Sequence, residues 1–96
     1  FDSLYYVHNI KIDEWDVSNV EDMSSMFRQC KNFNCDLSGW NVSNVEDMSS
    51  MFLFCDKFKS DLSSWDVSNV RVKMEVFWKC PNMESNKSLQ PKFNNV

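Results

Sequence analysis

The sequence repeats itself at a fixed spacing. The stretch WDVSNVEDMSSMF begins at Trp15, WNVSNVEDMSSMF begins at Trp40, 25 residues later, and WDVSNV returns at Trp65 before the sequence diverges. A fixed period of this length is typical of architectures in which each repeat buries its apolar face only against its neighbours. We therefore expect about three stacked coils within a single domain.

Apolar residues recur within each repeat at a helical spacing. In the first repeat, four of them are separated by steps of 3, 4 and 3, namely Val20, Met23, Phe27 and Cys30. This spacing predicts one face of a helix. Short helices are therefore expected near residues 20–30, 45–55 and 70–80.

The polar residues around these positions fit the ends of helices. Ser18 with Glu21, and Ser43 with Glu46, have the spacing of a capping box, and Pro81 fits a helix stop. The Ser and Asn columns at 18/19, 43/44 and 68/69 either cap helices or bridge adjacent coils through hydrogen bonds.

The segments between the predicted helices are short and alternate in polarity. CDLSG and SDLSS place Leu37 and Leu62 in one column, which Ile12 extends toward the N-terminus. One short strand per repeat, paired in parallel with the next, is expected here. The predicted fold class is therefore α/β, a curved solenoid of about three 25-residue coils with one short parallel strand and one short helix per coil.

The repeat columns also predict the core and the organisation of the chain. The expected core residues are Trp15, Trp40, Val20, Val45, Met23, Met48, Met26, Met51, Phe27, Phe52, Cys30, Cys55, Phe33, Phe58, Leu37 and Leu62. The expected units of the single repeat domain 1–96 are a partial N-terminal repeat at 1–14, repeats at 15–39, 40–64 and 65–80, and a C-terminal cap or tail at 81–96.

The repeated motif resembles a known family. WDVSNVEDMSSMF, followed by a Cys, a Phe and DLS, resembles the 25-residue repeat of mycoplasma-type surface lipoproteins, which are grouped with BspA-like leucine-rich-repeat proteins. The resemblance covers residues 8 to about 83. It implies a leucine-rich-repeat-like solenoid, a location at a cell surface or in a virion, a role in adhesion, and no shared catalytic residues. Cys35 and the third repeat from Arg71 onward depart from the family pattern.

Neither the cysteines nor the single histidine indicate a metal or cofactor site. Cys30, Cys55 and Cys80 share one column and are expected to be buried thiols, with a disulfide between neighbouring coils as the alternative. Cys35 lies outside this column and is expected to react faster. The spacing of 25 residues fits no zinc motif, and His8 has no obvious partner. No cofactor is expected.

Charge and residue pattern argue against several classes of function. The net charge is −4, which does not suit a nucleic-acid partner, and no apolar run is long enough to insert into a membrane. Ser3, His8 and Asp13 could be assembled into a triad only on paper, because nothing marks a nucleophilic serine. We expect no enzyme.

The positions that vary within an otherwise repeating frame suggest a contact surface. Just before the column cysteine, Arg28-Gln29 becomes Leu53-Phe54 and then Trp78-Lys79. Large apolar groups on a variable face are typical binding anchors, although the alternative is packing between coils. The candidate partner contacts are Leu53, Phe54, Trp78, Lys57 and Lys79.

Two hypotheses for function follow from this surface. In the first, the chain is a non-enzymatic surface binding or adhesion module that presents a repeat surface to a protein or glycan partner. In the second, it is a structural component of a larger assembly, such as a virion layer or a cell-surface array, and assembles through the ends of its coils.

Overall fold

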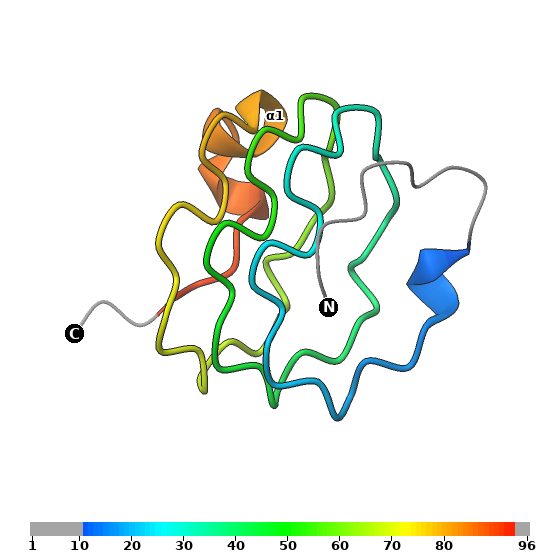
Figure 1. Ribbon diagram of the computed structural model, residues 1–96, viewed down its shortest axis with the longest axis vertical. Coiled ribbons are helices and arrows are strands. Elements are labelled where there is room, and N and C mark those ends of the chain that lie inside the picture. The colour runs from blue at the N-terminus through cyan, green and yellow to red at the C-terminus, as the bar shows by residue number, and fades with distance from the viewer. Residues whose placement is uncertain (1–10, 94–96) are drawn as a thin grey trace.

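The chain has very little regular secondary structure. The computed structural model describes residues 11–93 (Figure 1). Their helices are the 3-10 helix η1 (Ile12–Glu14), the α-helix α1 (Pro81–Glu84) and the 3-10 helix η2 (Lys87–Leu89). From residue 15 to residue 80 the chain consists of turns and connecting segments, and its β-structure is limited to isolated bridges.

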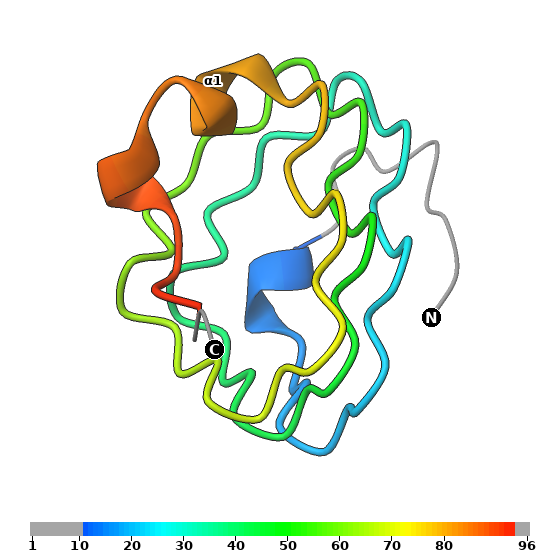
Figure 2. The ribbon, with the colours of Figure 1, turned by 90° about the vertical axis from the view of Figure 1, so that its left-hand side faces the viewer.

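The three repeats lie side by side, as the cyan, green and yellow runs of Figures 1 and 2 show. Main-chain hydrogen bonds join each repeat to the next. The N–H groups of Met23 and Phe27 donate to the carbonyls of Asp47 and Met51, each at 2.9 Å. The second and third repeats are joined in the same register. Residues 25 positions apart therefore make equivalent main-chain hydrogen bonds to the next repeat.

Each repeat follows a run of tight turns. The N–H groups of Met26 and Cys30 donate to the carbonyls three residues earlier, at 3.3 and 3.0 Å. The third residue of each of these turns, Ser25 or Gln29, has a positive φ of 57° or 63°, as in type II turns. The same conformation recurs in the later repeats at Ser50, Phe54, Glu75 and Lys79.

The predicted helices near 20–30, 45–55 and 70–80 are therefore wrong. An α-helix uses its N–H groups within one segment, whereas here alternate N–H groups are donated to the neighbouring repeat. A left-handed residue every fourth position also interrupts a helix. The spacing of 3, 4 and 3 indicates which side chains are buried, and a run of turns satisfies it as well as a helix does.

The predicted strands at the DLS segments are also wrong. Leu37 donates its N–H to the side-chain oxygen of Ser60 at 3.1 Å, so no parallel ladder forms there. The isolated parallel bridges, Asp22 with Asp47 and Asp47 with Val72, lie in the half of the repeat where helices were expected. The α/β leucine-rich-repeat-like solenoid, with one helix and one parallel strand per coil, is thus contradicted by residues 11–93, which contain no sheet.

The predicted core is largely correct. Every expected core residue is buried except Trp15, which is 36% exposed, and Val20, which is half-buried. Phe27, Phe52 and Phe77 form a column of stacked rings, with centroids 5.6 Å apart at both steps. Burial follows the 25-residue columns because equivalent side chains of adjacent repeats contact one another directly.

Side chains add hydrogen bonds between the repeats. The indole N–H of Trp40 donates to the carbonyl of Ile12 at 3.0 Å, and that of Trp65 donates to Leu37 at 2.9 Å. The amides of Asn44 and Asn69 donate to the carbonyls of Ser18 and Ser43 in the preceding repeat, each at 2.7 Å. Of the two alternatives for the Asn column, the structure therefore supports bridging over helix capping.

A short motif, Asp or Asn followed two residues later by Ser, shapes many of the turns. In the first repeat, Asp16 accepts hydrogen bonds from both the N–H and the hydroxyl of Ser18, at 3.0 and 2.6 Å. The same local pairing occurs at 22/24, 36/38, 41/43, 47/49, 61/63 and 66/68. Ser18 and Ser43, expected to cap helices, instead close these turns.

The end of the chain turns back over the third repeat. Pro81 was expected to stop a helix, but it begins α1, since a proline at the first helical position loses no hydrogen bond. Met83 on α1 is fully buried, and Leu89 and Phe93 pack against the core. The N–H of Leu62 donates to the carbonyl of Leu89 at 2.8 Å. We call residues 81–93 the C-terminal segment.

Candidate functional site

The third repeat carries an exposed apolar edge. Among residues 11–93 the exposed large hydrophobic side chains are Trp15, Val72, Met74 and Trp78. Three of these, Val72, Met74 and Trp78, lie within one run of the third repeat, and Met74 is 71% exposed. We call residues 72–79 the outer edge. In the second repeat the equivalent run is covered by the third repeat, so the outer edge is where this covering stops.

The sequence explains part of this exposure. In the first two repeats the positions equivalent to 72 and 74 hold Asp and Ser, which close a turn on each other. The third repeat replaces them with Val72 and Met74. These apolar residues cannot form that local turn, and their side chains remain 48% and 71% exposed.

The candidate contact residues are divided by the structure. Leu53 is only 7% exposed, so its side chain offers little surface to a partner. Trp78 is 49% exposed, and Phe54 is half-buried beside it, with the Phe54 N–H donating to the Trp78 carbonyl at 3.0 Å. The ammonium of Lys79 lies 5.4 Å from the centre of a Trp78 ring. Phe54, Trp78 and Lys79 therefore form one surface.

Lys57 lies apart from this group. Its side chain is exposed, but within residues 11–93 no hydrogen bond, ion pair or ring contact joins it to Trp78 or Lys79. Of the five candidates, the structure thus brings three together on the surface, buries Leu53 and leaves Lys57 without a contact to the others.

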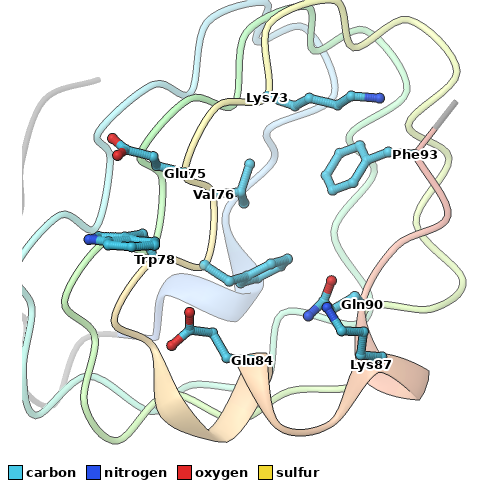
Figure 3. A pocket seen from close by; sticks show the side chains of 9 residues that line it. Lys73, Glu75, Val76, Trp78, Glu84, Lys87, Gln90 and Phe93 are labelled. Carbon is cyan, nitrogen blue, oxygen red and sulfur yellow. The ribbon is translucent and has the colours of Figure 1, made fainter. Parts of the chain in front are cut away.

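A groove runs along the outer edge. Figure 3 shows Lys73, Glu75, Val76 and Trp78 on one side of it and Phe93, Gln90 and Lys87 of the C-terminal segment on the other. The hollow has a volume of about 350 Å³. At one end, the ammonium of Lys73 lies 5.6 Å from the centre of the Phe93 ring, which ties the two walls together.

The groove is mixed in charge and apolar at its base. Lys73 and Lys87 offset Glu75 and Glu84, while Phe77, Val76 and Phe93 supply apolar surface. Such a lining selects for neither anions nor cations. It suits a neutral ligand with apolar groups, and sequence reasoning missed it because the C-terminal segment has no counterpart in the repeats.

A second hollow is acidic. It lies where the three repeats meet at Glu21, Asp22, Glu46, Asp47 and Arg71, and has a volume of about 280 Å³. Arg71 forms an exposed ion pair with Glu46 at 2.8 Å. Within residues 11–93 no cluster of three His, Cys, Asp or Glu side chains has the geometry to hold a metal ion.

The cysteines are thiols in a packed environment. Cys30, Cys55 and Cys80 are buried, and no disulfide joins any of the four cysteines. Burial raises the pKa of the Cys55 thiol, which also donates to the carbonyl of Phe27 at 2.9 Å, and raises the pKa of Cys80 to about 12. A raised pKa keeps these thiols protonated and unreactive at neutral pH.

Cys35, near the end of the first repeat, lies beside Asp13 of η1. The Cys35 sulfur is 3.7 Å from a carboxylate oxygen of Asp13, and Cys35 is half-buried. Burial, with the nearby negative charge, raises the pKa of Cys35, which is opposite to the activation of a nucleophile. Ser3 and His8, the other members of the triad drawn on paper, lie outside the described residues.

Within residues 11–93, no helix has the length and apolar composition needed to cross a membrane.

Comparison with family models shows that residues 1–95 match the family described as "Mycoplasma protein of unknown function, DUF285". No match to the BspA-like or leucine-rich-repeat families was found, so that part of the resemblance is not supported. Neither the curated proteins nor the solved structures gave a match.

Proposed function

The chain belongs to this Mycoplasma family of unknown function, and we propose that it is a non-enzymatic binding module whose contact surface is the outer edge of the third repeat. The observation that carries the proposal is the exposure of Val72, Met74 and Trp78 on one edge of an otherwise well-buried repeat array. Large exposed apolar groups that gather on one face are typical of contact sites.

Trp78 is the best candidate for the anchor of this surface. Tryptophan is enriched among the residues that dominate binding energy, because it offers a large apolar area at a low cost in conformational entropy. Phe54 lies next to Trp78 through a main-chain hydrogen bond, and the ammonium of Lys79 lies over the Trp78 ring, 5.4 Å from its centre. An aromatic ring of this kind suits an apolar side chain of a protein or the face of a sugar.

The resemblance to surface lipoproteins supplies the expected setting for this contact. We propose that the module acts at a cell surface, where it takes part in adhesion to a protein or glycan.

A variant at the anchor tests the proposal. Replacing Trp78 by Ser should leave the fold intact, since the side chain is half exposed, and should weaken attachment by about 2 kcal/mol or more, about thirtyfold in affinity. Trp78→Phe keeps an aromatic ring and serves as the matched control. The measurement is capture on glycan arrays and on immobilised surface proteins of host cells. Equal capture by the Ser variant and the parent would remove the outer edge as the site.

A structural role remains the second candidate, favoured by the place of the exposed edge. The outer edge lies on the side of the third repeat where the repeats would otherwise continue. A component of a virion layer or cell-surface array would associate through this end. Analytical ultracentrifugation separates the two hypotheses. A binding module should stay monomeric at protein concentrations up to about one hundred micromolar. An array component should associate over this range, and its Trp78→Ser variant should not.

A further inference from the structure

The outer edge offers main-chain hydrogen-bond donors as well as apolar side chains. In the second repeat, the N–H groups of Ser50, Phe52 and Phe54 donate to carbonyls of the third repeat at 2.9, 2.9 and 3.0 Å. Their equivalents one period later are Glu75, Phe77 and Lys79. None of the main-chain or side-chain acceptors in residues 11–93 is paired with these three N–H groups.

The C-terminal segment occupies only half of the position beyond the third repeat. The Leu62 N–H, equivalent to the Leu37 N–H that bonds to Ser60 of the next repeat, is taken by the carbonyl of Leu89. The C-terminal segment thus stands in for the DLS half of a further repeat. It leaves the other half, along residues 72–79, as the groove seen in Figure 3.

We propose that this groove binds a short segment of a partner protein that follows the same run of turns as residues 72–79, and whose backbone carbonyls accept from the N–H groups of Glu75, Phe77 and Lys79. This inference rests on the proposed function and specifies its chemistry. The added segment would continue the interface already present between the second and third repeats, in the same main-chain register. Addition of a strand to an exposed edge is a common mode of peptide recognition.

The occupant is defined by the space that remains. A complete repeat from a second copy would collide with the C-terminal segment, because Leu89 and Phe93 already pack on the core at that position. A single segment meets no such obstacle. The groove places no strong demand on the net charge of this segment, because Lys73 and Lys87 offset Glu75 and Glu84. The segment should carry apolar side chains to cover Phe93 and Trp78.

The test uses a probe that already fits this register. In the folded chain, carbonyls within residues 71–79 accept hydrogen bonds from the N–H groups of Ser50, Phe52 and Phe54. A synthetic peptide with the sequence of this segment, RVKMEVFWK, is therefore added to the intact chain. Amide hydrogen exchange is followed residue by residue by NMR. In the free protein, the amides of Glu75, Phe77 and Lys79 should exchange at least about tenfold faster than those of Ser50, Phe52 and Phe54. Saturating peptide should slow these three by about tenfold or more.

A charge at the edge supplies the matched variants. Met74→Lys places a positive charge at an exposed edge position, where it opposes the added segment and repels a peptide with three basic residues and one acidic residue, so peptide binding should weaken by about tenfold. Asn32→Lys adds the same charge at an exposed site of the first repeat and should leave binding unchanged. Both variants should fold, since neither side chain is part of the core.

Each contrary result has a definite meaning. Peptide binding without protection of the three amides would overturn main-chain addition and leave a side-chain contact, so the proposed function would stand alone. No binding at millimolar peptide would also overturn the inference, whereas the Trp78→Ser capture experiment decides the proposed function separately. Protection that grows with protein concentration in the absence of peptide would show a second copy on the edge, contrary to the occupant proposed here.

Discussion

The second and third repeats begin with the same WxVSNV motif but meet different surroundings. The second repeat has a neighbour on both sides, and Phe52 at its centre is fully buried and stacks on both Phe27 and Phe77. The third repeat has a neighbour on one side and the C-terminal segment over part of the other. Phe77 is 8% exposed there, and Trp78 replaces the buried Leu53. Position in the array, more than the local sequence, decides how much each residue contributes to stability.

The largest expected difference between the two repeats is at the phenylalanine column. Phe52→Ala removes a ring packed on both faces and on Phe58, so we expect the free energy of unfolding to fall by about 3–5 kcal/mol. Phe77→Ala removes a ring with one stacked neighbour and should cost less. Urea unfolding of both variants measures the gap. Equal losses would mean that the C-terminal segment supports the third repeat as fully as a further repeat would.

The tryptophans give the next largest contrast. Trp65→Phe deletes the indole donor to the carbonyl of Leu37, which keeps its second hydrogen bond from the Trp40 N–H at 3.1 Å. The expected cost is therefore that of one lost hydrogen bond, about 0.5–1.5 kcal/mol. Trp78→Phe alters a half-exposed ring on the outer edge and should change stability by less than about 0.5 kcal/mol. Thermal melting of the pair is the measurement. A Trp78→Phe variant that melts as low as Trp65→Phe would place Trp78 within the core instead of on the surface.

Alkaline pH should weaken both repeats through their thiols. Burial raises the pKa of Cys55 and of Cys80 above the ordinary value of 9.0. Above that pH the unfolded chain loses the thiol protons while the folded chain keeps them, so the free energy of unfolding falls as pH rises. The slope should approach about 1.4 kcal/mol per pH unit for each thiol. Cys55→Ala should reduce the slope between pH 9 and 11. An unchanged slope would mean that this thiol titrates freely in the folded state.

The sequence predicted burial far better than it predicted backbone conformation. The 25-residue columns identify Met23, Phe27, Leu37 and their equivalents as core because equivalent residues must meet wherever repeats are adjacent. The same spacing could not distinguish a helix from a run of turns, since both place these side chains on one face. The left-handed positions are occupied by Ser25 and Gln29 instead of glycine, so the sequence gives no sign of them.

One signal for the turns was present in the sequence. Asp or Asn two residues before Ser occurs repeatedly and favours side-chain-closed turns over helices, so Ser18 could have been read as part of a turn with Asp16. The candidate contact surface was only partly predictable. Variation at Trp78 and Lys79 marked it, but its groove depends on the C-terminal segment, whose fold does not follow the repeat.

The smallest expected effect comes from restoring the turn motif to the outer edge. The double variant Val72→Asp and Met74→Ser recreates the pair found at Asp22 and Ser24, where the carboxylate accepts from both the N–H and the hydroxyl of the serine. Both replaced side chains are exposed, so little apolar packing is lost, and we expect stability at pH 7 to change by no more than about 0.5 kcal/mol.

The pH dependence of this variant is more informative than its stability at neutral pH. Hydrogen bonds from Ser24 hold the pKa of Asp22 below its usual value of 3.8, and those from Ser63 do the same for Asp61. A carboxylate with a lowered pKa stabilises the folded state above pH 3.8, and that contribution disappears as the pH falls through the folded pKa. If the outer edge can adopt the interior turn, the double variant should therefore lose stability more steeply than the parent between pH 5 and 3. Asn32→Asp, which adds a carboxylate without a serine partner, is the control. Parallel acid curves for the parent and the double variant would show that the turn forms only where a further repeat covers it, and would make the difference between the two repeats one of backbone conformation as well as exposure.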